Sequence, residues 1–233
     1  MLPVAILAGG LATRMGDHTR QTPKAMLDIA GRPFIAWQLE MLAREGVERV
    51  VMCVKHLADQ IRDFVGDGSA FGLQVLWSED GDRLLGTGGA LRQALPLLGE
   101  SFFVTYGDSY LTLDLGAVER TFVEQRVPAL MTVFRNEDRW DKSNVQVQEG
   151  RVVLYSKTRR TAEMKYIDYG MGVLTAPLFD DDRLGEAFDV ARLYEELSEQ
   201  GRLGCYEATT RFYEIGSVAG WRETSAVLGG GTP

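Results

Sequence analysis

The sequence is poor in the residue types that carry most redox, metal and nucleophilic chemistry. Its 233 residues include 2 cysteines and 2 histidines. Cys53 and Cys205 stand far apart, so neither a disulfide framework nor a Cys-x-x-Cys metal site can be built from them. We interpret both as small core residues. With His18 and His56 as the whole histidine supply, a mechanism that depends on histidine has few candidates.

The sequence also lacks long hydrophobic runs and an excess of positive charge. No stretch reaches the roughly 18 uncharged residues that a membrane-spanning helix needs. Met1–Ala8 has no basic leader and runs straight into Gly9, unlike a signal peptide. The 25 Lys and Arg against 33 Asp and Glu give a net charge of −8, which argues against nucleic-acid binding. We therefore expect a cytoplasmic protein that binds neither nucleic acid nor a membrane.

The composition is that of an ordinary globular chain. Hydrophobic residues make up 45% and charged residues 25%, which argues against disorder. The length fits a single domain, and no internal repeat or low-complexity linker divides it. We expect one domain over residues 1–228 and a frayed tail over residues 229–233. The sequence leaves open whether the chain forms a homo-oligomer.

Short apolar runs alternate with amphipathic segments, which is typical of βαβ units. The first half predicts strands over 4–7, 47–54, 73–77 and 102–106, and helices over 33–46, 57–65 and 90–98. The second half predicts strands over 129–134, 144–147, 152–155 and 170–174, and helices over 190–200 and 218–228. We expect an α/β fold with a Rossmann-like, mainly parallel sheet flanked by helices and a small antiparallel addition.

Gly9 and Gly10 follow the first predicted strand directly. Glycines let the backbone approach a ligand closely, and consecutive amides can form an anion-binding nest. Arg14 and Lys24 add two cations suited to phosphate. A plain turn with a solvated lysine is the alternative interpretation. The glycine spacing fits neither the dinucleotide fingerprint nor the P-loop, which argues against a redox enzyme that uses a dinucleotide.

Asp108 follows the fourth predicted strand, directly after Gly107. In open α/β sheets, ligands bind outside the carboxyl ends of the strands, so Asp108 should face the phosphates. A carboxylate among phosphates makes sense if Mg²⁺ stands between them. A simple turn in which Asp108 hydrogen-bonds the local backbone is the alternative.

Several motifs in order along the chain resemble the signature of the sugar-1-phosphate nucleotidyltransferases. They are Leu7-Ala8-Gly9-Gly10-x-x-Thr13-Arg14-Met15, Pro23-Lys24-Ala25-Met26-Leu27, Gly31-Arg32-Pro33, Leu85-Gly86-Thr87-Gly88-Gly89-Ala90, Gly107-Asp108 and Phe212-Tyr213-Glu214-Ile215-Gly216-Ser217. The resemblance spans residues 3–225 and implies a GT-A-like nucleotidyltransferase fold. The compact length and the Gly-Thr-Gly-Gly motif are most similar to the heptose 1-phosphate guanylyltransferases.

The resemblance implies Mg²⁺-dependent transfer of a nucleotidyl group from a nucleoside triphosphate to a sugar 1-phosphate, with release of pyrophosphate. It assigns catalysis to Arg14, Lys24 and Asp108, and Mg²⁺ binding to Asp108 and Glu214. The implied nucleotide-binding residues are Leu7, Ala8, Gly9, Gly10, Thr13, Arg14, Glu79, Gly86, Thr87 and Gly88. The resemblance also implies that the antiparallel addition binds the sugar. The implied sugar-binding residues are Gly107, Asn144, Lys157, Asp168, Tyr169 and Gly170.

The substrate pair is less determined than the reaction. We favour GTP with D-glycero-α-D-manno-heptose 1-phosphate or mannose 1-phosphate; other pairs and phosphocholine cytidylyl transfer are alternatives. The metal and sugar sites depart from the family pattern at three places. Glu214 stands where Asp is usual, Lys157 lacks its customary flanking Glu and Pro, and residues 168–170 replace an Asn-Ala-Gly segment. The first two departures motivate a further alternative, a catalytically silent regulatory protein that binds a nucleotide sugar.

Overall fold

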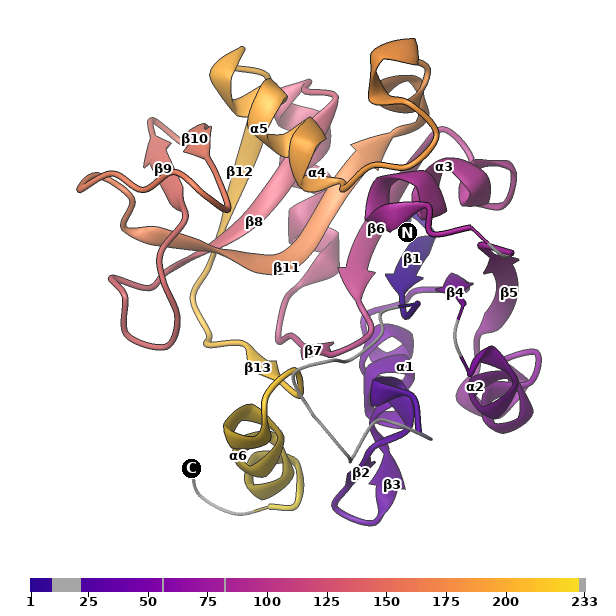
Figure 1. Ribbon diagram of the computed structural model, residues 1–233. Coiled ribbons are helices and arrows are strands. Elements are labelled where there is room, and N and C mark those ends of the chain that lie inside the picture. Colours follow the sequence, from indigo (N-terminus) through magenta and orange to yellow (C-terminus); the bar gives the residue numbers. More distant parts are fainter. Residues whose placement is uncertain (10–21, 56, 82, 231–233) are drawn as a thin grey trace.

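The computed structural model describes residues 1–9, 22–55, 57–81 and 83–230. Its centre is a nine-stranded sheet with the strand order β5-β4-β1-β6-β11-β8-β12-β10-β9 (Figure 1). The strands are β1 (Val4–Leu7), β4 (Arg49–Val54), β5 (Gln74–Glu79), β6 (Ser101–Tyr106), β8 (Ala129–Arg135), β9 (Val145–Gln148), β10 (Arg151–Tyr155), β11 (Tyr166–Thr175) and β12 (Leu203–Ala208). Two small pairs join β2 (Asp28–Ile29) to β3 (Arg32–Pro33) and β7 (Ser109–Tyr110) to β13 (Tyr213–Glu214).

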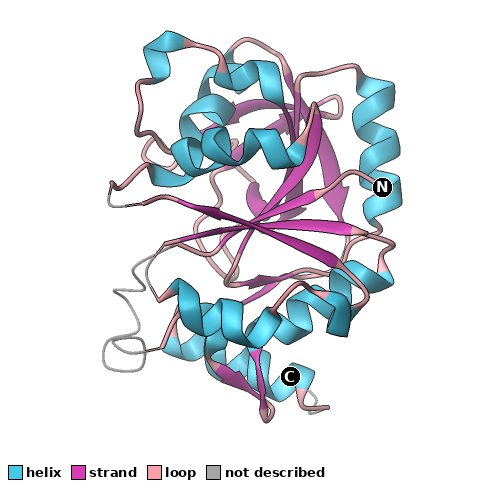
Figure 2. Cartoon of the chain, turned by 90° about the vertical axis from the view of Figure 1, so that its right-hand side faces the viewer, coloured by secondary structure: helices cyan, strands magenta, loops and turns pink. Residues whose placement is uncertain are grey.

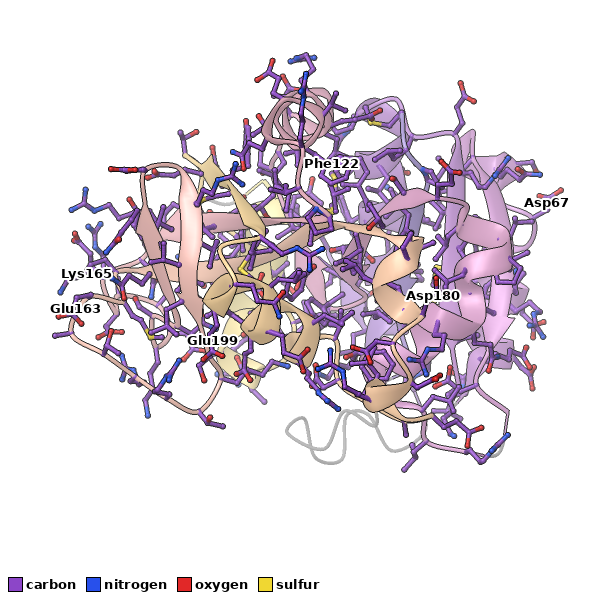
Figure 3. All side chains as sticks on the ribbon, turned by 90° about the horizontal axis from the view of Figure 1, so that it is seen from above. Asp67, Phe122, Glu163, Lys165, Asp180 and Glu199 are labelled. Atoms are coloured by element: carbon purple, nitrogen blue, oxygen red, sulfur yellow. The ribbon has the colours of Figure 1, made fainter. Side chains whose placement is uncertain are left out.

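The sheet is mixed, as the sequence predicts. Strands β5, β4, β1 and β6 run parallel, whereas β11 is antiparallel to both β6 and β8. The antiparallel strands do not form a separate appended sheet, because β11 hydrogen-bonds β6 and continues the parallel half directly. Seen from above, Asp67 lies at one end of the molecule and Glu163 and Lys165 at the other (Figure 3).

Helices cover both faces of the sheet (Figure 2). They are α1 (Phe34–Arg44), α2 (Ala58–Val65), α3 (Gly86–Leu98), α4 (Leu115–Gln125), α5 (Ala191–Glu199) and α6 (Val218–Leu228). Because successive side chains of a strand point to opposite faces, Ile6 packs in one core with Ile35 of α1, and Ala5 packs in the other with Leu91 of α3. The carboxyl ends of the parallel strands are thus framed by helices on both sides.

Helix α3 begins at Gly86, four residues before the predicted start at Ala90. Glycine is a poor helix former, so the glycine cluster favours a loop from sequence alone. A tertiary contact overrides that preference, because the N–H groups of Gly88 and Gly89 both donate to the Phe188 carbonyl oxygen.

The sequence analysis also missed α4 and β12. Helix α4 buries Leu115, Val118 and Phe122 at helical spacing, a pattern that the sequence does contain. Strand β12 lies between β8, to which it is parallel, and β10, to which it is antiparallel. Its composition, with Gly204, Cys205 and Glu207, gives a weak strand signal.

The two cysteines are buried and free, as we interpret them from the sequence. Burial raises the pKa of both thiols to about 12, so each stays protonated and chemically inert at neutral pH. Within the described ranges, no helix combines the length and apolar character needed to cross a bilayer.

Candidate active site

A cavity of about 490 Å³ opens at the carboxyl ends of β1, β4 and β6. This is the edge of the sheet at which the sequence places the ligand. The predicted site residues among its lining are Leu7, Ala8, Gly9, Lys24, Gly86, Thr87, Gly107 and Asp108. Gly10, Thr13 and Arg14, also predicted for this site, lie outside the described residues.

The floor of the cavity is formed where the ends of β1 and β6 meet. The Gly107 N–H donates to the Leu7 carbonyl oxygen at 3.0 Å. A Cβ atom on Gly107 would lie 2.9 Å from the Ala8 Cβ, closer than two side chains can approach. Glycine at 107 therefore lets the two strand ends lie close together and brings Asp108, the next residue, to the carboxyl end of β1.

Lys24 and Asp108 form an ion pair on the cavity wall, with Lys24 Nζ 3.0 Å from Asp108 Oδ2. The side chains keep 17% and 28% of their exposure, so both are sheltered yet accessible to a ligand. Lys24 begins the short 3₁₀ turn Lys24–Met26, directly after Pro23. The predicted phosphate-binding cation, Lys24, and the predicted metal-binding carboxylate, Asp108, are thus in contact although they lie 84 positions apart in the sequence.

Gln38 holds the loop that carries Asp108, a role that sequence reasoning missed. This fully buried residue of α1 donates from Nε2 to the carbonyl oxygens of Tyr106 at 2.8 Å and Ser109 at 3.0 Å. Its Oε1 has no partner among the described residues. A polar residue on the apolar face of a predicted helix was the signal that could have identified it.

The other wall contains charged residues that sequence reasoning also missed, Lys55 and Asp80. Burial raises the pKa of the Asp80 carboxyl, and the Lys55 charge acts in the opposite direction. Glu79, the predicted base contact, is absent from the lining; its side chain pairs with Arg62 and its carbonyl oxygen accepts from Gln93. The residue that faces the cavity is thus the neighbour of the predicted one.

The glycines of the Gly-Thr-Gly-Gly motif serve packing as well as the cavity wall. A Cβ on Gly86 would overlap the Phe188 backbone, and one on Gly88 would overlap the Phe188 ring. Gly86 and Thr87 line the cavity. The motif therefore brings the segment that precedes α5 against the cavity wall.

Three predicted sugar-binding residues, Asn144 directly before β9 and Asp168 and Gly170 of β11, form a connected group. Asn144 Oδ1 accepts from the Asp168 N–H at 3.0 Å, and Asp168 Oδ1 accepts from the Gly170 N–H at 3.0 Å. Burial raises the pKa of the Asp168 carboxyl to about 6. The Tyr169 ring instead packs in the core beside Phe212, with ring centroids 5.9 Å apart.

Lys157, predicted to bind the sugar phosphate, makes an ion pair with Asp189. Lys157 Nζ lies 3.0 Å from Asp189 Oδ2. Asp189 Oδ1 also accepts from the Thr87 hydroxyl at 3.0 Å. Through Asp189 the lysine is connected to a residue of the cavity wall.

The Asp108 carboxylate is suited to bind Mg²⁺. Mg²⁺ usually takes one or two carboxylates and completes its shell with water and substrate phosphate oxygens. Asp108 provides one such carboxylate on the wall of a cavity that Lys24 and Gly9 also line. In the described part of the chain, no three His, Cys, Asp or Glu side chains gather closely enough to hold a metal ion.

The pairing of β13 with β7 brings the Glu214 backbone close to Asp108, but the Glu214 carboxylate is engaged elsewhere. The Ile215 N–H donates to the Asp108 carbonyl oxygen at 2.9 Å. The Glu214 carboxylate accepts from the Gly216 N–H and, at 2.7 Å, from the Ser217 hydroxyl, at the start of α6. The assignment of Glu214 as a second metal ligand stays a prediction.

Comparison with known proteins identifies relatives of this chain. Residues 4–177 match a family model described as a MobA-like NTP transferase domain. The chain is 30% identical over 237 residues to N-acetylmuramate alpha-1-phosphate uridylyltransferase of Neisseria meningitidis, covering 96% of this chain and 97% of that protein. It is 27% identical over 191 residues to D-glycero-alpha-D-manno-heptose 1-phosphate guanylyltransferase of Campylobacter jejuni, covering 82% of this chain and 84% of that protein.

Among solved structures, the crystal structure of HddC from Yersinia pseudotuberculosis superposes with a TM-score of 0.84. The sequence identity is 23%, and the match covers 98% of this chain and 100% of that chain. This likeness establishes the shared fold.

Proposed function

Because the chain belongs to the MobA-like NTP transferase family and to the sugar-1-phosphate nucleotidyltransferases, we propose that it transfers GMP from GTP to a heptose or mannose 1-phosphate with the help of Mg²⁺. The sugar phosphate oxygen attacks the α-phosphorus, the bond to the β-phosphate oxygen breaks, and pyrophosphate leaves. The products are a GDP-sugar and pyrophosphate.

The observation that carries the reaction is the Lys24–Asp108 pair on the cavity wall. Both substrates are anions, so the obstacles are charge repulsion and alignment, and placed cations overcome both. Lys24 would lie against the α-phosphate and neutralise the charge that develops there. The sugar phosphate is already ionised at neutral pH, so the site needs no general base.

Asp108 would hold the Mg²⁺, which supplies charge neutralisation on the phosphates when it is bound. The residues of this chain do the remaining work. Gly9 lets the backbone approach the triphosphate, and Gln38 keeps the Asp108 loop in place from beneath.

Asp80 supports guanine as the base. Guanine presents two adjacent donors, N1–H and the exocyclic amino group, on one edge, and the two oxygens of a carboxylate can accept from both. Uracil and thymine present a single N–H flanked by two carbonyl oxygens, which a carboxylate would repel. A partly buried Asp80 on the cavity wall therefore favours GTP.

Uridylyl transfer to N-acetylmuramate 1-phosphate is a second candidate. The observation that favours it is the Neisseria meningitidis relative with that activity, which matches this chain at 30% identity over nearly the whole length of both. A catalytically silent nucleotide-sugar-binding protein is a third, motivated by the engagement of the Glu214 carboxylate at α6.

The test is pyrophosphate release. Purified protein with Mg²⁺ is offered GTP, UTP, dTTP, CTP and ATP, each against heptose, mannose, glucose and N-acetylmuramate 1-phosphates and against phosphocholine. We expect the highest kcat/KM with GTP and heptose or mannose 1-phosphate. A preference for UTP with N-acetylmuramate 1-phosphate would contradict the proposed substrate pair and support the second candidate. Nucleotide binding without release for every pair would identify a silent protein.

A further inference from the structure

The residues 186–190, which precede α5, are fixed against the start of α3. The Phe188 N–H donates to the Leu85 carbonyl oxygen at 2.9 Å, and the Gly88 N–H donates to the Phe188 carbonyl oxygen at 2.9 Å. The Phe188 ring fills the space that a side chain at Gly88 would occupy. Asp189 follows Phe188 and is therefore held beside the cavity wall.

The Asp189 carboxylate gathers donors from three parts of the chain. Oδ1 accepts from the Thr87 hydroxyl at 3.0 Å and from the Ala191 N–H at 2.9 Å. Lys157 Nζ lies 3.2 Å from Oδ1 and 3.0 Å from Oδ2. The Thr87 hydroxyl oxygen in turn accepts from the Val190 N–H at 2.8 Å. One carboxylate thus ties a residue of the cavity wall to the start of α5 and to the lysine after β10.

The charge state of Asp189 suits this role. Burial acts to raise the pKa of its carboxyl, but the hydrogen bonds from Ala191 and Lys157, together with the Lys157 charge, leave it lowered. The carboxylate is therefore ionised at neutral pH and pairs with Lys157 as a charged group.

We propose that Asp189 is a positioning residue that holds the Lys157 ammonium at the rim of the cavity, beside Thr87, to receive the phosphate of the sugar substrate. The inference rests on the proposed function. A free lysine side chain samples many rotamers, and a fixed carboxylate beside it removes most of that freedom before the substrate arrives. The ammonium has three N–H donors, so at least one is left for a phosphate oxygen while Asp189 holds the others.

Stabilisation of the fold does not account for this arrangement. The side chains of Lys157 and Asp189 are 47% and 54% exposed, and ion pairs at such exposure contribute little to stability. The Arg159–Glu199 pair, also at α5, is a matched case at 2.9 Å with 56% and 58% exposure. Among the described residues, Glu199 is not part of the cavity lining, so it serves as the control.

The first experiment compares Asp189→Asn with Glu199→Gln. Asparagine keeps an oxygen for the Ala191 N–H and the Thr87 hydroxyl, so the start of α5 is preserved, while the negative charge that pairs with Lys157 is lost. We expect the KM for sugar 1-phosphate to rise about tenfold, which corresponds to about 1.4 kcal/mol, and the KM for the nucleotide to stay within about twofold. Glu199→Gln should leave both KM values and kcat unchanged.

The second experiment asks whether Asp189 acts through Lys157. Lys157→Gln should itself raise the KM for sugar 1-phosphate, and adding Asp189→Asn to it should cause no further rise, because residues that act as one unit are not additive. Wild-type kinetics for Asp189→Asn, or full additivity in the double variant, would overturn the inference while wild-type turnover upholds the proposed function. A wild-type protein that releases no pyrophosphate with any pair would instead overturn the proposed function, and this inference with it.

Discussion

Lys24 Nζ lies 3.0 Å from Asp108 Oδ2, so the cavity wall presents a paired cation and anion before any ligand arrives. The pair keeps both side chains in place, Asp108 after the end of β6 and Lys24 at the start of the 3₁₀ turn Lys24–Met26, where isolated charges would move more freely. In the proposed reaction, Lys24 contacts the α-phosphate and Asp108 binds Mg²⁺. These two roles can be tested separately by substituting each residue.

Lys24→Ala should lower kcat about 100-fold and raise the KM for either substrate much less, because the lysine stabilises charge that develops at the α-phosphorus. Steady-state kinetics with both substrates measure the split. Lys165→Ala, an exposed lysine at the far end of the molecule (Figure 3), is the control and should match the wild type. A change confined to KM would limit Lys24 to ground-state binding.

Asp108→Asn should reduce turnover about 100-fold or more, because the amide keeps the volume but loses the charge that holds Mg²⁺. The melting temperature, measured by circular dichroism, should change little. Asp180→Asn, at an exposed aspartate, controls for removal of one negative charge. Normal turnover in Asp108→Asn would leave Asp108 as a turn residue.

Asp80→Asn should weaken the preference for GTP. The carboxamide offers one acceptor where the carboxylate offers two, so it pairs less well with the two guanine donors. We expect the ratio of kcat/KM for GTP to that for UTP to fall about tenfold, the effect of losing one good bidentate contact of about 1–3 kcal/mol. Glu79→Gln, at the neighbouring residue whose side chain pairs with Arg62, should leave the ratio unchanged. An unaltered ratio in Asp80→Asn would place base selection elsewhere on the cavity wall.

Local patterns predict most of the sheet, because alternation and glycine boundaries are written in consecutive residues. The strands around Ile6 and Val104 and the helix around Leu39 follow from such patterns. The start of α3 does not follow, since it depends on the Phe188 carbonyl oxygen, about 100 residues away. The continuity of the antiparallel strands with β6 is likewise a long-range pairing that no local pattern encodes.

The candidate site divides in the same way. Lys24, Asp108 and the strand-end glycines could be predicted because they stand at strand ends or belong to ordered motifs. Asp80 and Asp189 could not be predicted in this way, because isolated acidic residues in loops are common. Only the structure shows that Asp80 lines the cavity and that Asp189 accepts a hydrogen bond from Thr87. Asp80 lines the cavity and its neighbour Glu79 pairs with Arg62, because successive side chains at a strand end point to opposite sides.

Gln38→Met should lower kcat about tenfold with a small effect on stability. The substitution removes the two hydrogen bonds that hold the Tyr106–Ser109 loop, each of about 1 kcal/mol, but it also removes the buried Oε1 that has no partner in the described part of the chain. Leu39→Met, a volume-conserving change on the same helix, should leave turnover at the wild-type level. Kinetics and thermal unfolding of both variants make the measurement. A kcat equal to that of the wild type would show that other contacts suffice to hold the Asp108 loop.

Asp168 should make stability depend on pH below neutrality. Its pKa is raised to about 6 by burial, against the hydrogen bond from Gly170 and the charge of Lys157; in the unfolded chain it returns to about 3.9. Between these values the unfolded chain has released the proton that the native state retains, so the contribution of this group to stability falls as pH rises from about 4 to about 6 and is constant above that. Asp168→Asn keeps an acceptor for the Gly170 N–H and cannot ionise. The free energy of unfolding of the wild type relative to Asp168→Asn, from urea titrations across this range, should therefore decline with rising pH and then level off. A difference that is flat, or that rises with pH, would mean that Asp168 is well solvated or firmly paired with Lys157.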